Sequence, residues 1–152
     1  MTPDDERSQA EDGLHEARLA RDGVRLAAFG HACWLMGRSG VHRHLFFSDA
    51  DWLVMPPIIL NQYRLWVRNG LPYGFASWAH LGEVPALRMT SGVVKLAPAD
   101  WKSGTETWLV DFVAPFGGEA ELARELKVEV FPEVTVKTLR SQSGGTMSVG
   151  EL

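Results

Sequence analysis

Cysteine is almost absent from this sequence. Cys33 is the single thiol, so no disulfide can form within the chain. No group of cysteines and histidines has the spacing of a zinc site either, and we expect no bound metal. Proteins without disulfides are typical of reducing compartments, so the expected localisation is cytoplasmic.

Long apolar runs are also missing. No segment approaches the roughly 20 consecutive apolar residues that a membrane-spanning helix needs. The N-terminus is acidic and polar, whereas a secretory signal would be basic and then apolar. We therefore expect a soluble protein that is neither exported nor stably inserted in a membrane.

Nucleotide-binding signatures do not occur. The sequence contains neither a Walker loop nor the glycine fingerprint of dinucleotide-binding folds. Its net charge of −4 and the lack of a basic cluster argue against nucleic acid as a partner. The charge is uneven, however, because residues 1–22 have a net charge of −4, residues 25–102 a net charge of +4 and residues 103–152 a net charge of −4. The positive segment is suited to an acidic partner, and a solvated surface of mixed charge is the alternative.

The length of the chain fits a single domain. Its 152 residues, 45% of them hydrophobic, are enough for one real core. Residues 1–22 form an acidic N-terminal extension that we expect to be partly disordered, because its first part has no apolar face, and residues 23–152 form the domain. Apolar positions between residues 14 and 36 recur at helical spacing and predict one or two helices, with a break at Asp22-Gly23.

Antiparallel strands are predicted for the middle of the chain. Residues 62–68 alternate between apolar and polar positions, and Asn69-Gly70 is a strong hairpin signal before a returning strand at residues 72–80. A third strand is expected at residues 105–113, then a helix near residues 118–127 and a closing hairpin around Gly144-Gly145. Residues 82–95 fit either helix or strand. The pattern predicts an α+β fold with a mostly antiparallel central sheet and flanking helices.

Two residues stand out for their chemistry. His42 follows a glycine-bracketed loop, and histidine can accept a proton near neutral pH. Asp111 lies in the apolar run of the third strand, where we expect it to share a face with Thr107 and Leu109. A buried carboxylate can fix the imidazole tautomer and stabilise its cation, so the sequence suggests a His/Asp catalytic pair. The alternative is that His42 is an ordinary surface or core histidine.

Short motifs follow one another in a fixed order between residues 29 and 117. They are rich in tryptophan, glycine and proline: Gly30-His31, Trp34-Leu35, Ser39-x-x-His42-Arg43, Pro56, Asn61-Gln62-Tyr63, Pro72, Ser77-Trp78-Ala79, Asp100-Trp101, Ser103-Gly104, Trp108, and Asp111 leading to Ala114-Pro115-Phe116-Gly117. In this order they resemble the RTX toxin-activating lysine acyltransferases, the hemolysin-activating family. The resemblance runs without a gap over residues 29–117 and fades after Glu119.

The resemblance implies a fold similar to that of the GNAT acyltransferases. The implied reaction moves a fatty acyl group from acyl carrier protein to internal lysines of an RTX-type protoxin, with no bound cofactor. The family's catalytic histidine falls on His42, its essential aspartate on Asp111 and a further serine on Ser39. We expect Arg38 and Arg43, in the positive segment, to meet the acidic acyl carrier protein. The oligomeric state stays open, a homodimer included.

The chain departs from the family pattern at two positions near His42. Gly40 stands where the pattern has proline, and His44, where it has asparagine, is a second candidate base. The C-terminal third is also shorter than in the usual member. A covalent acyl-histidine intermediate stays open.

Two other functions stay open as well. The first is a catalytically silent relative that binds acyl carrier protein or an RTX protein. The second is a GNAT-like acetyltransferase that uses CoA. The pyrophosphate loop of CoA-dependent GNAT enzymes has no convincing copy in the sequence, which favours a donor carried by a protein.

Overall fold

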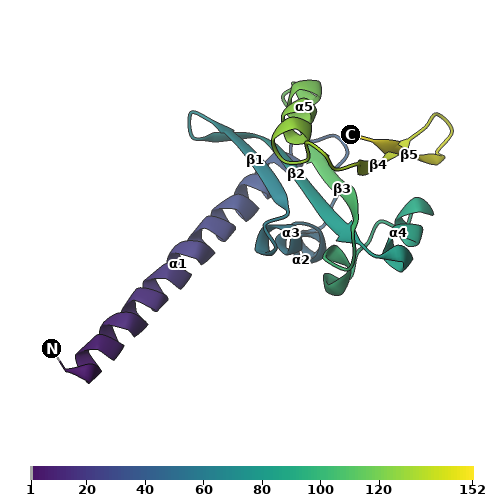
Figure 1. Cartoon of the computed structure of the whole chain (residues 1–152). Helices are drawn as coiled ribbons and strands as arrows, with labels where there is room; N and C mark the ends of the chain where they lie inside the picture. Colours follow the sequence, from purple (N-terminus) through teal and green to yellow (C-terminus); the bar gives the residue numbers. More distant parts are fainter. Residues whose placement is uncertain (1) are drawn as a thin grey trace.

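The computed structural model describes residues 2–152, which form a five-stranded sheet with helices packed on it (Figure 1). The helices are α1 (Pro3–Met36), α2 (Ala50–Leu53), α3 (Met55–Ile59), α4 (Glu83–Thr90) and α5 (Glu119–Glu129), with 3-10 turns η1 (Phe47–Asp49) and η2 (Pro98–Trp101). The strands are β1 (Tyr63–Arg68), β2 (Leu71–Leu81), β3 (Glu106–Val113), β4 (Val136–Ser141) and β5 (Met147–Glu151).

The strands lie in sequence order across the sheet, β1-β2-β3-β4-β5. Three of the four neighbouring pairs are antiparallel, and β3 and β4 are parallel. The predicted α+β fold with a mostly antiparallel sheet is thus confirmed, while the likeness to GNAT acyltransferases stays a prediction. The ambiguous segment at residues 82–95 forms α4 and then an irregular stretch.

The hairpin between β1 and β2 turns at Asn69-Gly70, as predicted. Both residues have positive φ angles, 51° for Asn69 and 76° for Gly70. A two-residue hairpin of this kind needs positive φ at both central positions, and asparagine followed by glycine meets that need at low cost. Local residue chemistry alone therefore sets this turn.

A β-bulge shifts the pairing between β2 and β3. Ser77 pairs with Asp111, but the next residue of β2, Trp78, pairs with Leu109, so Val110 is the extra residue of β3. Since Ser77 and Trp78 point to opposite faces of β2, Asp111 and Leu109 do as well. The prediction that Asp111 shares a face with Leu109 is therefore wrong. The bulge turns Asp111 toward the face on which α1 packs.

Helix α1 runs without interruption through Asp22 and Gly23, so the predicted break at this point is wrong. A single glycine costs a helix only about 1 kcal/mol relative to alanine, and the alanines, leucines and arginines around it favour the helix. A capping box between Thr2 and Asp5 fixes the first turn. The division of the chain at residue 22, with a partly disordered extension, stays a prediction.

The body of the protein packs on the C-terminal end of α1, and the N-terminal part of this helix projects away from it (Figure 1). The buried residues of α1 all belong to this end: Ala28, Ala32, Leu35 and Met36. They pack with Phe75 of β2 and Val113 of β3. None of the helices at residues 2–152 is both long and apolar enough to cross a membrane.

The opposite face of the sheet is covered by α5. Leu122 and Leu126 of this helix pack with Trp66, Ala76 and Trp78. Gly74 lets this packing be close, since a Cβ atom on it would lie 2.6 Å from Leu122 Cδ1 and the leucine side chain would have to shift. The sheet thus has two covered faces, and the α1 face also carries Asp111.

Candidate active site

His42 lies in the loop that follows α1. The side chains of Ser39 and His42 face each other within this turn, with Ser39 Oγ 2.8 Å from His42 Nδ1. The backbone N–H of Arg43 donates to Ser39 O at 3.0 Å, which closes the turn. A separation of three residues is enough to bring the two side chains together, so this contact depends on local geometry alone.

Asp111 completes the arrangement from β3. Its Oδ1 lies 2.8 Å from His42 Nε2, although 69 residues separate the two in the sequence. Both side chains are largely buried, with 13% of His42 and 9% of Asp111 exposed. The structure thus brings together three of the predicted site residues, Ser39, His42 and Asp111, in one hydrogen-bonded chain.

The hydrogen bonds define the proton positions on His42. An ionised carboxylate only accepts hydrogen bonds, so Nε2 carries a proton and donates it to Asp111. In a neutral imidazole Nδ1 is then the acceptor, and it accepts the hydroxyl proton of Ser39. The basic lone pair of His42 therefore points at Ser39. The carboxylate on the far side of the ring stabilises the cation that forms when Nδ1 takes a proton.

The second carboxylate oxygen of Asp111 has a different environment. Within residues 2–152, Asp111 Oδ2 is buried and has no hydrogen-bond partner. The hydroxyl of Ser77, its partner residue across the β2–β3 ladder, is likewise buried and unpaired in the same range. Sequence reasoning included Ser77 in a motif but gave it no role at the site, because the pairing that puts it beside Asp111 depends on the bulge.

The predicted donor-binding arginines lie on the surface near this loop. The Arg38 guanidinium stacks 3.6 Å from the centroid of the Trp34 ring and donates to Trp34 O at 3.0 Å. Arg43 follows His42 directly and is exposed. His44, the second candidate base, is exposed too, and the contacts to Ser39 and Asp111 belong to His42 instead.

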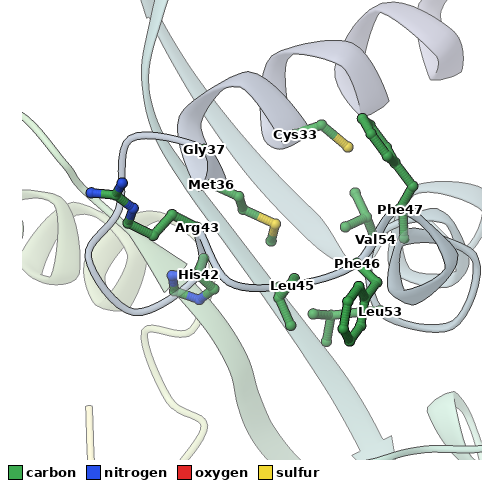
Figure 2. Close-up of a pocket in the computed structure, with 11 residues that line it drawn as sticks. Cys33, Met36, Gly37, His42, Arg43, Leu45, Phe46, Phe47, Leu53 and Val54 are labelled. Carbon is green, nitrogen blue, oxygen red and sulfur yellow. The ribbon is translucent and has the colours of Figure 1, made fainter.

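Two cavities meet at His42. The first has a volume of about 310 Å³ and is mostly apolar (Figure 2); it is lined by Cys33, Met36, Gly37, His42, Arg43, Leu45, Phe46, Phe47, Ala50, Leu53 and Val54. The second, of about 440 Å³, is also lined mostly by apolar side chains, and Asp111 and Thr138 are among its lining residues. Among the described residues, no group of histidine, cysteine, aspartate and glutamate side chains is arranged to hold a metal ion.

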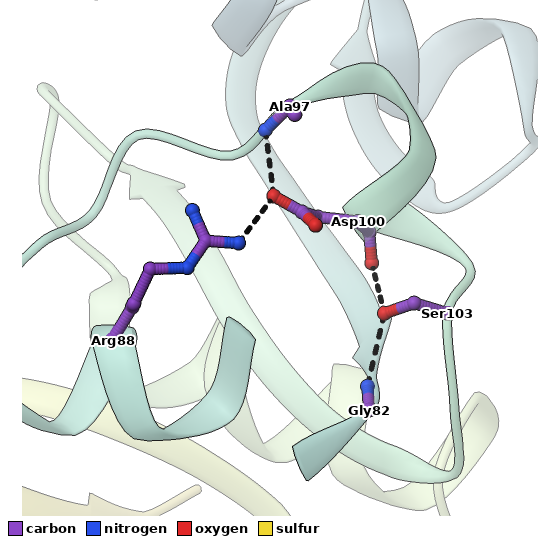
Figure 3. A network of polar contacts seen from close by, with 5 residues as sticks. All are labelled: Gly82, Arg88, Ala97, Asp100 and Ser103. Atoms are coloured by element: carbon purple, nitrogen blue, oxygen red, sulfur yellow. Dashed lines mark hydrogen bonds and ion pairs between the residues drawn. The ribbon is translucent and has the colours of Figure 1, made fainter. Parts of the chain in front are cut away.

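Other motif residues have structural contacts away from His42. Asp100 accepts hydrogen bonds from Arg88 and from the backbone N–H of Ala97, both at 2.8 Å (Figure 3). The Ser103 hydroxyl donates to Asp100 O and accepts from the Gly82 N–H, which ties the end of β2 to η2. These residues hold α4, η2 and β2 together.

Comparison with known proteins identifies the family. Residues 23–149 match the family described as the RTX toxin acyltransferase family. The chain belongs to this family. The predicted resemblance is thereby confirmed, and the match continues past residue 117 to the C-terminal hairpin.

Relatives of the chain within the RTX toxin acyltransferase family carry names that specify a reaction. This chain is 33% identical to the RTX-III toxin-activating lysine-acyltransferase of Actinobacillus pleuropneumoniae over 117 residues, which are 77% of this chain and 67% of the relative. It is 33% identical to the protein-lysine myristoyltransferase of Escherichia coli over 115 residues, 76% of this chain and 67% of the relative. The leukotoxin-activating lysine-acyltransferase of Aggregatibacter actinomycetemcomitans is 32% identical, with 77% and 69% covered. The aligned part thus spans about two thirds of each relative.

Proposed function

We propose that this protein transfers a fatty acyl group from acyl carrier protein to a lysine side chain of an RTX-type protoxin. The observation that carries the proposal is the hydrogen-bonded chain Ser39–His42–Asp111 at the end of an apolar cavity. Relatives named as toxin-activating lysine-acyltransferases and as a myristoyltransferase support the class of acceptor and the class of acyl group.

The reaction needs a base that removes a proton from the lysine, because the acyl group of the donor is already activated. A thioester is already reactive, whereas a lysine ammonium, with a pKa of about 10.4, must first lose a proton. We assign this role to His42 Nδ1, with the Ser39 hydroxyl passing the proton from the amine to the ring. Asp111 stabilises the imidazolium that results.

The bonds and protons balance as follows. The lysine nitrogen forms a bond to the acyl carbon, and the bond from that carbon to the donor sulfur breaks. Two protons leave the lysine ammonium on the way to the amide: one is released to solvent, and the one taken up by His42 returns to the leaving thiolate. The products are an amide, a free thiol and the released proton. In the loop at residues 37–41, the N–H groups of Gly37, Arg38 and Ser39 donate to carbonyl oxygens of α1. The N–H groups of Gly40 and Val41 are therefore the candidate donors for the oxyanion of the intermediate.

The acyl donor is the part of the proposal that needs the most direct test. The protein is incubated with an RTX protoxin and with myristoyl groups on either acyl carrier protein or CoA, and acyl-lysine is measured by mass spectrometry. We expect acylation from acyl carrier protein. Acylation from CoA alone would indicate a CoA-dependent enzyme, and binding of the donor or the protoxin without acylation would indicate a silent relative.

A further inference from the structure

The cavity of about 310 Å³ beside His42 has a mostly apolar wall, and His42 is the one candidate catalytic residue among those that line it. Cys33 and Met36 of α1, Leu45 and Phe46 of the loop and Leu53 of α2 form most of its wall (Figure 2). His42 lies at the edge of the same cavity. A volume of this size is typical of small-molecule sites, which are mostly apolar with a few polar groups.

We propose that this cavity holds the hydrocarbon chain of the acyl donor, with the thioester carbon next to His42. The assignment rests on the proposed function and adds the location of the chain to it. The second cavity at His42 is also lined mostly by apolar side chains, but Asp111 and Thr138 belong to its lining as well. A hydrocarbon bound there would exclude water from around these two polar side chains, which costs free energy, whereas the lining of the first cavity is apolar apart from His42 and Arg43.

Cys33 provides a direct probe of the cavity, since it is the single thiol of the chain and lies in the wall. Burial raises the pKa of the Cys33 thiol, so labelling with a maleimide is measured at one fixed alkaline pH. We expect sodium myristate to slow the labelling by about tenfold or more, and sodium octanoate to slow it far less, because each further methylene adds buried apolar area. Equal labelling rates with and without myristate would overturn the assignment.

Two variants separate the two cavities. Ala50→Phe adds a ring to the wall of the first cavity and should weaken myristate binding by roughly tenfold or more. Met147→Phe adds the same ring to the second cavity and should leave myristate binding unchanged. Both variants are compared by calorimetry after their melting temperatures have been matched against the parent. Weakened binding in Met147→Phe alone would place the chain in the second cavity and overturn the proposal.

Failure of the cavity assignment can be distinguished from failure of the proposed function. His42→Ala should still bind myristate while it transfers no acyl group. Binding by the parent without acylation of any protoxin would contradict the proposed function and leave the cavity assignment standing. Acylation by Ala50→Phe at the parent rate, with unchanged myristate binding, would contradict the cavity assignment and leave the proposed function standing.

A different observation concerns Ser77. Its hydroxyl and Asp111 Oδ2 are two buried polar atoms without partners among residues 2–152, and their residues pair directly across the β2–β3 ladder on one face of the sheet. Directly opposed residues have Cβ atoms about 4.5–5.5 Å apart, so a change of the Ser77 side chain to another χ1 rotamer can bring its oxygen to Asp111 Oδ2. A buried oxygen pair that stays unsatisfied is costly.

We infer that Ser77 is a positioning residue whose hydroxyl donates to Asp111 Oδ2. This bond would hold the carboxylate in the plane that presents Oδ1 to His42. Ser77→Ala should then lower kcat by about tenfold with little change in KM, because the loss affects His42 rather than substrate binding. The proton NMR signal of the His42 Nε2–H should also weaken or shift.

Thr107→Val is the matched control for Ser77→Ala. Thr107 has a buried hydroxyl on the same sheet, but it bonds His80 Nδ1 at 3.0 Å instead of a site residue. This variant should keep the parent kcat and the parent His42 signal. A parent kcat and an unchanged signal in a folded Ser77→Ala protein would show that Ser77 merely fills space.

Discussion

At the scale of single residues, His42 and His44 are close in sequence and differ in what they touch. His42 bonds both Ser39 and Asp111, whereas His44 is exposed to solvent. His42→Ala should abolish acyl transfer and His44→Ala should keep most of it, with both proteins folded by circular dichroism. An exchange of the two phenotypes would show that His44 is the base.

The charge of Asp111 can be separated from its shape. Asp111→Asn keeps the size of the side chain but removes the charge that stabilises the His42 imidazolium, and its amide can hold the ring in the wrong tautomer. We expect a loss of kcat of about 10²-fold or more, measured as acyl-lysine formed per minute. A parent rate would make Asp111 a structural residue only.

At the scale of the elements, the close approach of two backbone segments depends on Gly104. A Cβ atom on Gly104 would lie 2.5 Å from Gly82 Cα and 2.6 Å from Leu81 O. Because backbone atoms cannot move aside easily, Gly104→Ala should destabilise the fold by about 1–3 kcal/mol. Thermal unfolding should show a fall of about 2–4 °C for each kcal/mol. Gly40→Ala, which meets nothing within 4 Å, should leave the melting temperature nearly unchanged.

The elements also show what the sequence could predict. The turn at Asn69-Gly70 depends on two neighbouring residues, so residue types were enough to predict it. The orientation of Asp111 depends on the extra residue Val110, which appears only when β2 and β3 are paired. The alternation of apolar residues within β3 carries no signal for that pairing, and the predicted face was therefore wrong.

For helix α1, the sequence predicted an interruption that the structure does not have. Asp22-Gly23 is a valid local signal for a break, yet the helix continues through it. Helix formation is cooperative, so the favourable residues on both sides outweigh one unfavourable position. At the site, Ser39 and His42 are three residues apart and could be related by local geometry, whereas the contact of His42 with Asp111 was suggested by chemistry and by the family resemblance.

At the scale of the whole molecule, positive charge is concentrated in the middle of the chain, while both ends are acidic. The positive segment at residues 25–102 includes Arg38 and Arg43 beside the site, while the projecting part of α1 is acidic. If acyl carrier protein is the donor, acyl transfer should slow as salt rises, since the screening length falls from about 10 Å at 0.1 M to about 3 Å at 1 M. An acyl-transfer rate that does not change with salt would show that charge does not guide the docking of acyl carrier protein.

Charge-reversal variants can show which face of the protein the acyl carrier protein contacts. Arg43→Glu should raise KM for the acyl carrier protein more than it lowers kcat. Arg124→Glu makes the same change on α5, which covers the other face of the sheet, and should leave KM unchanged. Equal KM values for the two variants would place the donor elsewhere.

The C-terminal hairpin of β4 and β5 joins the rest of the sheet through the short parallel pairing of β3 with β4, so we expect the hairpin to open on its own. Thr107 pairs with Val136 and Trp108 with Lys137, while β4 and β5 pair along five positions. Two residue pairs hold this junction together, so β4 and β5 should separate from β3 more often than the whole protein unfolds. Hydrogen–deuterium exchange should therefore replace the amide protons of residues 136–151 well before those of β2. Thr138 and Met147 belong to this hairpin and to the second cavity, so the exchange rate would also report how often that cavity widens.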